Sequence, residues 1–433
     1  MKNKIIAAIL SVFCLSLISC EKTSSISDNK SKAEISSIRE KSSEQPLTSA
    51  PAAASAVTSA VSEPATESQP STEPVKLSGS KTVPVYEELT INEFLTEANI
   101  VVLNGSDPLD TSETGEKSVT IKYSAGGKEQ EKTLTYVVED TEAPIILNSG
   151  WNPYHRVGED FDLNDYVGFA DNYDSAPVLT YDGYIDPGTI GDYPLTAHVS
   201  DSSGNISDWD LTISVVSSVP SPPDDRERID FSDFAYIYGA LGRPGIDVST
   251  WQGNIDWSAV RDAGCEFAII RMGYSYDSIV MDDCFYANIE GARAAGIDLS
   301  VYFYTTANSE DEIREQAKWI ADNLNGAELD LPVGFDWEEF GSFQKYGMNI
   351  KQINDLYAVF NDEMAKYGYD TMLYSSKNFL NNIWNDHSKS ISPVWLAHYV
   401  EDTDYEGDYF IWQQSSCGRI PGIYGDVDMN IIY

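Results

Sequence analysis

The sequence predicts an α/β fold: a truncated (β/α) barrel of eight strands and about five helices, preceded by two all-β sandwich domains. Three observations lead to this prediction. From Arg243 onward, strand patterns alternate with helix patterns, which is typical of a parallel sheet covered by helices. Upstream of this region, a set of short strands with alternating apolar residues occurs twice. The first part of the chain has a composition that cannot form a packed core.

Residues 1–19 predict export. Two lysines precede an apolar run from Ile5 to Ile18, which is short for a bilayer span and typical of a secretory signal peptide. The sequence Leu17-Ile-Ser-Cys20 resembles a bacterial lipobox, in which the cysteine is lipidated and begins the mature chain. We therefore expect lipidation at Cys20, and an ordinary signal peptide that happens to contain a cysteine is the alternative.

Residues 20–80 predict a disordered tether. The segment is rich in Ser, Thr, Ala, Pro and Glu and almost lacks aromatic residues. Such a chain buries too little apolar surface to offset the entropy that ordering would cost. A flexible segment of about 60 residues has a typical span of roughly 45 Å, so it would hold the following domains away from the membrane.

An internal repeat follows the tether, with a period of about 75 residues. Val85–Phe94 parallels Val157–Tyr166, and each copy ends in an alternating strand. Short strands of period two, separated by turns rich in Gly, Asn and Asp, are typical of small β-sandwiches. The repeat predicts two all-β domains, over residues 81–140 and 141–218.

Both repeats resemble bacterial Ig-like domains. The resemblance rests on Asp140-Thr-Glu-Ala-Pro144 at the start of the second copy and on Val199–Asn205 near its end. Domains of this kind are usually spacers or adhesive modules, and we favour a spacer over a carbohydrate-binding module. Residues 219–240, which include Pro220 to Pro223, are expected to form a stiff linker.

Residues 241–433 supply the strands and helices of the expected barrel. The expected strands are Gly245–Ser249, Phe267–Met272, Leu299–Tyr304, Leu331–Glu338, Thr371–Ser375, Val394–Tyr399, Tyr409–Gln414 and Asp426–Asn430. The expected helices are Asp256–Gly264, Asp283–Gly296, Ser309–Asn325, Asn349–Gly368 and Asn378–Trp384. The last three strands are joined by loops alone, which makes the barrel a truncated one.

Four carboxylates lie near the ends of these strands. In barrels of this class the functional residues lie at the C-terminal ends of the strands. Asp247 comes from the first strand, Asp336 and Glu338 from the fourth, and Asp428 from the eighth. The first and last strands become neighbours when a barrel closes, so we expect Asp247 and Asp428 to be adjacent.

Asp336 and Glu338 predict acid–base chemistry. Side chains alternate along a strand, so residues two apart project from the same face. Two nearby carboxylates repel each other when both are ionised, so one tends to hold a proton at neutral pH. Hydrolysis of a glycosidic bond needs such a pair. An Asp-x-Glu sequence alone is more often a solvated strand end, and the other two carboxylates favour the catalytic interpretation.

Composition excludes several other functions. The net charge of −41 argues against nucleic acid, since a phosphate backbone requires a basic face. With four histidines and five cysteines, no His/Cys metal site is expected, and we predict neither a metal nor another cofactor. An odd number of cysteines beyond Cys20 predicts free, buried thiols rather than a disulfide framework.

The C-terminal domain resembles glycoside hydrolase family 25, the lysozymes of the Chalaropsis and cellosyl type. The resemblance covers about residues 243–433 and includes motifs on most strands in the right order. These motifs are Gly245–Gly253, Ile255–Trp257, Phe267–Arg271, Asp336-Trp-Glu338, Trp395–Tyr399, Trp412–Ser415 and Gly425–Asn430. The resemblance implies an N-acetylmuramidase that cuts the β-1,4 bond between N-acetylmuramic acid and N-acetylglucosamine in peptidoglycan.

The resemblance also implies roles for the carboxylates. Glu338 corresponds to the family's general acid, and Asp336 would orient the 2-acetamido group of the substrate, which acts as the nucleophile. Asp247 and Asp428 match the remaining carboxylates of the site. Burial beside Trp337 is expected to raise the pKa of Glu338 while Asp336 stays ionised. A direct attack by Asp336 on the sugar stays open, because the sequence does not give the carboxylate separation.

Aromatic side chains are expected to bind the sugars, because flat rings stack on the apolar faces of sugars. Our candidates for substrate binding, with polar contacts included, are Tyr302, Tyr374, Trp395, Tyr399, Gln413 and Arg271. For Trp395 and Trp412, packing inside the barrel is an equally good interpretation. His398 is expected to be a structural strand residue.

We therefore expect a monomeric, extracytoplasmic muramidase, lipid-anchored to the bacterial cell membrane and facing the cell wall, whose partners are peptidoglycan glycan strands. Two alternatives were weighed. A non-catalytic wall-binding or adhesive lipoprotein would have the same N-terminal half. A chitinase-like hydrolase also ends its fourth strand in Asp-x-Glu, but its longer motif would need aspartates at Leu331 and Gly334.

Overall fold

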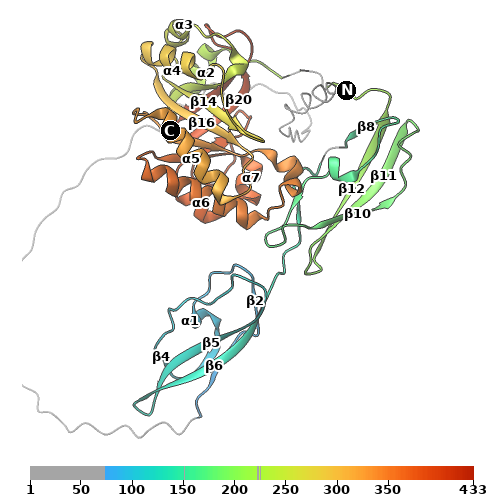
Figure 1. The fold of residues 1–433 in the computed structure, drawn as a ribbon, viewed down its shortest axis with the longest axis vertical. Helices are drawn as coiled ribbons and strands as arrows, with labels where there is room; N and C mark the ends of the chain where they lie inside the picture. The colour runs from blue at the N-terminus through green and yellow to red at the C-terminus, as the bar shows by residue number, and fades with distance from the viewer. Residues whose placement is uncertain (1–73, 151, 222–223, 225) are drawn as a thin grey trace, which may run out of the picture. The chain divides into compact units, whose positions relative to one another are not determined.

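The computed structural model describes residues 74–150, 152–221, 224 and 226–433 (Figure 1). The chain forms two compact units. Among the described residues, the first unit holds the chain from residue 74 to Lys81 together with Glu88–Leu109 and Ser118–Tyr136, and the second holds Thr82–Glu87, Asp110–Lys117 and the chain from Val137 onward. Three expected features lie outside the described residues: the signal peptide, the lipidation site at Cys20 and most of the tether.

The first β domain contains a four-stranded and a two-stranded sheet. The larger sheet has the order β2 (Thr82–Pro84), β6 (Lys128–Glu139), β5 (Gly115–Ala125) and β4 (Val101–Val102). The smaller one pairs β1 (Leu77–Gly79) with β3 (Leu95–Ala98), and the short helix α1 (Ile91–Phe94) precedes β3. Leu77 is buried, so the folded domain begins before residue 81, within the range we assigned to the tether.

The second β domain has the same kind of organisation. Its four-stranded sheet has the order β10 (Val178–Gly183), β11 (Gly191–Ser200), β12 (Ile206–Val216) and β8 (Tyr154–Arg156). The smaller sheet pairs β7 (Ile145–Ile146) with β9 (Phe169–Ala170), and the 3-10 turn η1 (Leu163–Asp165) precedes β9. From Leu195 in β11 and from Leu211 in β12, every second residue is buried, as the alternating pattern predicts. The assignment of both domains to the Ig-like class stays a prediction.

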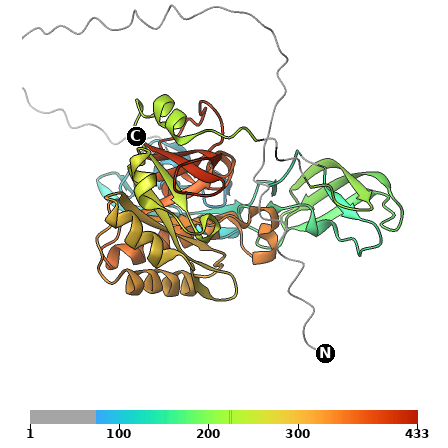
Figure 2. The same ribbon diagram turned by 90° about the horizontal axis from the view of Figure 1, so that it is seen from above.

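The third folded region is a barrel of eight strands. Its strands are β13 (Arg243–Val248), β14 (Phe267–Ser275), β16 (Asp298–Thr305), β17 (Val333–Asp336), β18 (Thr371–Ser376), β19 (Val394–Ala397), β20 (Ile411–Gly418) and β21 (Val427–Ile432). The ring closes because β13 pairs with both β14 and β21. Figure 2 shows the red C-terminal strands next to the yellow-green start of the barrel. The expected eight-stranded barrel is therefore present.

The last strand of the ring runs in the opposite direction to the other strands, whereas all strands of a regular (β/α) barrel are parallel. β21 runs antiparallel to both of its neighbours, β13 and β20, whereas the other pairings of the ring are parallel. No helix connects β20 to β21, so the chain can turn back directly. A ninth strand, β15 (Ile279–Met281), extends β14 as an antiparallel hairpin outside the ring.

Helices cover the outside of the strands. The five expected helices are present as α3 (Trp257–Asp262), α4 (Phe285–Ala294), α5 (Glu310–Leu324), α6 (Ile350–Lys366) and α7 (Lys377–Asn382). Two 3-10 segments, η2 (Thr250–Gln252) and η3 (Glu339–Tyr346), and the short helix α8 (Asp386–Ser390) complete the described barrel region. Helices α5 and α6 pack side by side over the strands (Figure 1).

Helix α5 shows why these segments are helical. Its buried residues recur at helical spacing, from Ile313 through Ala317 and Ile320 to Leu324. Three acidic residues occupy its first turn, where the helix dipole favours negative charge. The helix ends at Asn325, whose positive φ of 48° continues the chain in the left-handed region.

The expected linker is not a linker throughout. Helix α2 (Phe231–Tyr238) lies within residues 219–240, and Phe231, Phe234 and Tyr238 are buried in the same core cluster as the barrel strands and helices. These three residues recur at helical spacing, so the helix has an apolar face that must be covered. The folded barrel region therefore begins near residue 229.

Large side chains fill the interior of the barrel. The inner cluster contains Phe267, Met372, Tyr374, Trp395 and Ile411. A Cβ at Gly334 would lie 2.9 Å from the Cβ of Tyr302 and 3.4 Å from the Trp395 ring, so glycine is needed beside them. The barrel is thus a packed core that supports a site at one end, and not a pore.

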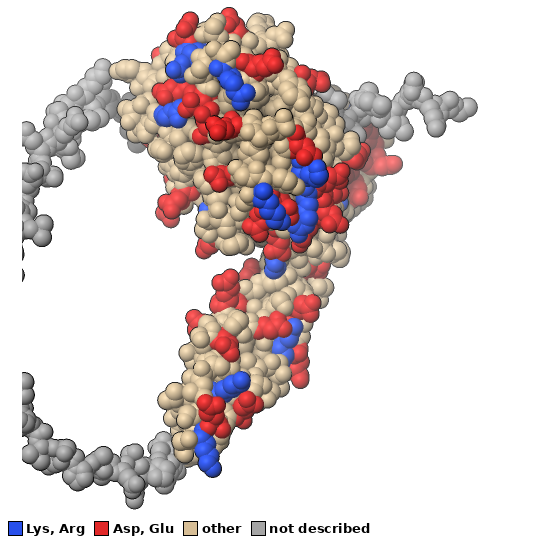
Figure 3. Space-filling model, turned by 60° about the vertical axis from the view of Figure 1, so that its left-hand side comes forward, with Lys and Arg blue, Asp and Glu red and all other residues tan. Residues whose placement is uncertain are grey.

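Other features of the described chain concern charge, thiols and membrane insertion. Acidic side chains are spread over the visible face, with Lys and Arg beside them in places (Figure 3). Cys265 and Cys417 are buried free thiols and Cys284 is a half-buried one, as expected. Within the described ranges, no helix is both long and apolar enough to cross a membrane.

Candidate active site

The four carboxylates meet at one end of the barrel. Asp336 is the last residue of β17, and Glu338 follows two residues later, just before η3. Asp247 on β13 lies directly opposite Asp428 on β21 in the strand register, so the expected adjacency is present. Because β21 is antiparallel, Asp428 reaches this end from the beginning of its strand and not from its end.

The carboxylates differ in exposure. Asp247 and Asp336 are only 5% and 4% exposed, Asp428 is half-buried, and Glu338 is exposed. Loss of water contact is the main cause of a raised pKa for each of the four, and the charge of Asp247 also raises the pKa of Asp336, Glu338 and Asp428. An accessible acid above buried partners is suited to receive a ligand from solvent.

Two amides hold Asp247 in place. Gln413 Nε2 and Asn430 Nδ2 donate hydrogen bonds to Asp247 Oδ2 over 2.8 and 2.7 Å. Both bonds favour the ionised carboxylate, so the pKa of Asp247 rises only to about 6, although burial acts to raise it further. Asn430 also accepts a hydrogen bond from Trp395 Nε1 over 2.8 Å, which fixes the orientation of its amide.

Asp336 and Glu338 affect each other's ionisation. Burial raises the pKa of both carboxyl groups, and that of Asp336, which the charge of Glu338 raises further, lies well above its usual value. The two groups therefore do not both ionise readily in the free protein. The raised pKa of Asp336 differs from our expectation that Asp336 stays ionised, because the sequence did not reveal how deeply Asp336 is buried.

Trp337 does not line the mouth. Its ring is fully buried and contacts Phe340, Phe343 and Tyr346, with centroid distances of 4.9, 5.4 and 5.3 Å. Its Nε1 donates to the carbonyl of Ala307 over 3.3 Å. Trp337 thus anchors the turn between β17 and η3, which positions the two flanking carboxylates.

Arg271 is engaged by a neighbouring carboxylate. Its Nε and Nη2 atoms both lie 2.8 Å from Asp282 Oδ2, and the side chain of Asp282 is completely buried. The Arg271 charge also lowers the pKa of Asp336, so the cation acts on the site electrostatically. We expected a polar contact to the substrate, whereas the geometry assigns Arg271 to the support of the site.

Gln413 is likewise used within the protein. Its Oε1 accepts hydrogen bonds from Tyr374 Oη over 2.9 Å and Tyr399 Oη over 2.8 Å, while its Nε2 donates to Asp247. The side chain is 3% exposed. Gln413 therefore connects two tyrosines to Asp247, and our prediction of a direct sugar contact is not supported by its surroundings.

The four aromatic candidates separate into buried and accessible rings. Trp395 is 1% exposed and packs against Tyr374, with 4.6 Å between the centroids of the two tilted rings, so the packing interpretation holds for Trp395. Tyr374 is 8% exposed and Tyr302 is half-buried. Of the four, Tyr399 is the most accessible, at 38% exposure. Trp412 is also buried, and its Nε1 donates to the carbonyl of His398 over 2.8 Å.

Sequence reasoning missed three exposed aromatic residues in loops at this end. Trp251 follows β13 and is 72% exposed, Tyr276 follows β14 and is 51% exposed, and Tyr424 precedes β21 and is 99% exposed. The candidates had been sought within the strands, where rings fill the barrel. The better signal is an aromatic residue just beyond a strand end, where loops form the site.

Sequence reasoning also missed two polar residues that support the carboxylates. Asn430 lies two residues after Asp428 on the same strand, so the spacing that identified Asp336 and Glu338 would have identified this pair as well. Asp282, by contrast, lies in a loop after β15 and gives no such pattern.

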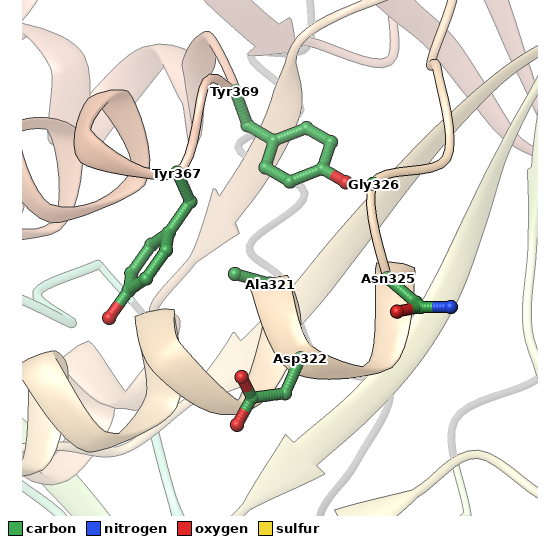
Figure 4. A pocket seen from close by; sticks show the side chains of 6 residues that line it. All are labelled: Ala321, Asp322, Asn325, Gly326, Tyr367 and Tyr369. Atoms are coloured by element: carbon green, nitrogen blue, oxygen red, sulfur yellow. The ribbon is translucent and has the colours of Figure 1, made fainter.

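Two hollows in the described surface lie away from the carboxylates. One, of about 300 Å³, is formed by the end of α5 and the segment after α6, and Figure 4 shows Tyr367 and Tyr369 beside Ala321. The other, of about 600 Å³, is in the second β domain between β10, β11 and β12. Neither contains one of the four carboxylates, so we place the candidate site at the mouth formed by the strand ends.

Comparisons with known proteins identify the family of the barrel region. The family model described as glycosyl hydrolases family 25 matches residues 246–423. Lysozyme M1 of Streptomyces globisporus is 35% identical over 206 residues, which make up 44% of this chain and 67% of that protein. The autolytic lysozyme of Clostridium acetobutylicum is 30% identical over 189 residues, 43% of this chain and 54% of that protein.

A solved structure is also similar. The crystal structure of the bacterial lysozyme from Streptomyces coelicolor has 32% sequence identity and a TM-score of 0.40, and the match covers 44% of this chain and 92% of the other. All of these matches involve less than half of the chain, so they concern the barrel region alone.

Proposed function

Because the chain belongs to glycoside hydrolase family 25, we propose that it is a muramidase that cleaves the β-1,4 bond between N-acetylmuramic acid and N-acetylglucosamine in peptidoglycan. The observation that supports this proposal most directly is the pair Asp336 and Glu338 at the mouth of the barrel, one buried and one exposed, both with a raised pKa. An accessible carboxyl group that holds a proton beside a buried carboxyl group is what acid-catalysed cleavage of a glycosidic bond requires.

Glu338 is the proposed general acid and base. It would donate its proton to the leaving oxygen as the bond to the anomeric carbon breaks, and would later remove a proton from the attacking water. The carbonyl oxygen of the 2-acetamido group on the same sugar would attack the anomeric carbon and form a cyclic intermediate. Water would open that intermediate with retention of configuration.

Asp336 is the proposed positioning group for the acetamido side chain. Burial and the charge of Glu338 raise the pKa of Asp336 in the free protein. When Asp336 accepts a hydrogen bond from the acetamido N–H, its ionised form is favoured, because that bond stabilises the charge. A proton held by the pair would then lie on Glu338, which needs it. Substrate binding would in this way keep Glu338 protonated, and direct attack by Asp336 on the sugar would be unnecessary.

Asp247 and Asp428 are proposed to stabilise positive charge. Cleavage passes through a transition state in which the sugar ring resembles an oxocarbenium ion. Two neighbouring carboxylates at the same mouth would favour that charge, and the amides of Gln413 and Asn430 hold Asp247 ready without reorganisation. Trp251, Tyr276, Tyr399 and Tyr424 would provide the flat surfaces for the sugar rings.

The location of the enzyme is also proposed. Lipidation at Cys20 would anchor the chain to the outer face of the bacterial membrane, and residues 20–76 with the two β domains would extend the barrel toward the wall. We propose that the enzyme acts as a monomer. Radiolabelled palmitate incorporated by the wild-type chain and not by Cys20→Ala would test the anchor.

Analysis of product ends tests the proposed reaction. Purified peptidoglycan is digested with the full chain, and the released fragments are reduced and examined by mass spectrometry. Muramic acid at the new reducing ends is expected. Glucosamine at these ends would assign the chain to the other bond, and no new ends would overturn the proposal. Chitin oligomers are digested in parallel, and preferential cleavage of these would support a chitinase-like specificity.

A further inference from the structure

A second group of carboxylates lies where the chain passes from the first β domain into the second, with two of its three members in the second domain. Asp140 directly follows β6, Asp171 directly follows β9, and Asp201 directly follows β11. One oxygen from each of the three lies within 4.8 Å of the others. The three residues come from widely separated parts of the sequence and are 6%, 0% and 8% exposed. The fold therefore gathers three buried acids at one point.

Two of these carboxylates have an oxygen without a partner. Asp140 Oδ2 and Asp171 Oδ2 are fully buried and accept no hydrogen bond from the described residues. Among residues 74–150, 152–221, 224 and 226–433, no lysine, arginine or histidine forms an ion pair with any of the three. Buried charges are normally paired or bound to a metal, because leaving them bare is costly.

The remaining oxygens are held by backbone and amide groups. Asp171 Oδ1 accepts from the amides of Tyr173 and Asp174 over 2.9 and 2.6 Å. Asp201 accepts from Asn205 through both of its oxygens, each over 2.8 Å. Asp140 Oδ1 accepts from the amide of Glu142 over 3.3 Å. These hydrogen bonds hold the three carboxylates close together in spite of their mutual repulsion.

The electrostatics of the group favour a positive partner. The three carboxylates are buried and lie close together, so their charges repel each other in surroundings that screen them little. A cation between them would reverse this effect. Asn172 Oδ1, one residue after Asp171, is also buried without a partner among the described residues.

We propose that Asp140, Asp171 and Asp201 form a calcium site that stabilises the second β domain. Calcium binds six to eight oxygen ligands at about 2.3–2.6 Å, so two oxygens on one ion lie at most about 5 Å apart, as these oxygens do. Ligands from three loops, without His or Cys, suit calcium's irregular geometry and exclude a typical zinc site. The sequence predicted no metal because that prediction rested on the small number of His and Cys residues, whereas carboxylates alone can bind calcium.

Calorimetry with the full chain tests this site. The chelator-treated wild-type chain, solubilised in detergent, is titrated with calcium chloride. We expect one saturable site per chain with a Kd of about 1 mM or lower, the range of extracellular calcium modules. Asp171→Asn and Asp201→Asn are expected to weaken binding at least tenfold. Asp186→Asn is the matched control, because Asp186 caps a turn of the same domain by accepting from the Gly188 amide over 3.0 Å.

Thermal unfolding distinguishes a metal site from a purely structural role. In excess calcium, the wild-type domain is expected to unfold several degrees higher than with chelator, whereas Asp171→Asn should not respond. With chelator, Asp171→Asn should be at least as stable as the wild type, because it removes a buried, repelled charge. If Asp171 were only structural, the variant would be less stable under both conditions.

The following results would overturn the proposal. The wild-type chain would show no saturable binding up to about 5 mM calcium, or the two variants would bind as the wild type does. Complete displacement of calcium by an equal concentration of magnesium would overturn the assignment to calcium. Many weak sites that persist in all variants would indicate general attraction to the acidic surface and would likewise overturn it.

Discussion

The two buried groups of carboxylates in this chain differ in what surrounds them. At the barrel mouth, Asp247 accepts hydrogen bonds from two side-chain amides, and Glu338 is exposed to solvent. In the second group, Asp140, Asp171 and Asp201 are all buried, and two of them keep an oxygen without a partner, as Asp336 does at the mouth. The comparison teaches that a cluster of acids does not define a function. An exposed acid beside buried ones favours acid–base chemistry on a ligand from solvent, and a wholly buried group with bare oxygens favours a cation.

Removal of the acid should have the largest effect. Glu338→Gln keeps the shape of the side chain but cannot donate a proton to the leaving oxygen, so kcat should fall roughly 10³-fold. Release of reducing ends from peptidoglycan measures the change. Glu328→Gln, an exposed residue between α5 and β17, is the control and should retain full activity. If Glu338→Gln remained active, Glu338 would not be the acid, and the carboxylates at the barrel mouth would no longer differ in function from those of the β domain.

The next largest expected effect is that of Asp247 on the pH dependence of stability. The pKa of Asp247 is about 6 in the folded chain and near 3.8 when exposed, so the folded state binds this proton more tightly. The stabilisation is complete below pH 4 and is lost as the pH rises through 6, by about 3 kcal/mol. Asp247→Asn has no such proton and should flatten the curve.

Urea unfolding followed by tryptophan fluorescence from pH 4 to 7 measures this difference. The wild-type free energy of unfolding should fall over this range, and that of Asp247→Asn should change much less. An equal fall in both chains would mean that other groups dominate the pH dependence, such as Asp336, whose pKa is also raised by burial.

Loss of an exposed ring at the mouth should have a smaller effect. Stacking of an aromatic ring contributes about 1 kcal/mol, so Tyr399→Ala or Trp251→Ala should raise KM several-fold with little change in kcat. Tyr286→Ala, which removes a 57% exposed ring from α4, is the control. A fall in kcat alone would show that Tyr399 acts through its hydrogen bond to Gln413 instead.

Calcium should have the smallest effect on hydrolysis. Among the described residues, the three carboxylates that could hold a cation lie away from the barrel mouth. Chelation should therefore leave kcat/KM on a short soluble substrate within about twofold. Measurement of hydrolysis with and without chelator checks this. A large loss that calcium restores in the wild type but not in Asp171→Asn would show that the two groups are coupled.

Much of the barrel could be predicted from the sequence. The alternation of apolar strands with amphipathic helices predicted eight strands and five covering helices, since each pattern follows from the local geometry of the backbone. The adjacency of Asp247 and Asp428 followed from closure of the ring. Helix α2 was missed because proline residues just upstream suggested a linker, and its apolar face is explained only by the core that it covers.

The sequence by itself determined which residues bring the chemistry: four carboxylates near strand ends, and an acidic chain unsuited to nucleic acid. Only the tertiary structure decided how each one is used. It buried Asp336 and so raised its pKa, turned Gln413 and Arg271 toward Asp247 and Asp282, and buried Trp395. It also gathered Asp140, Asp171 and Asp201. The physical reason is that burial, donors and neighbouring charges set the state of a carboxyl group, and these come from distant parts of the chain.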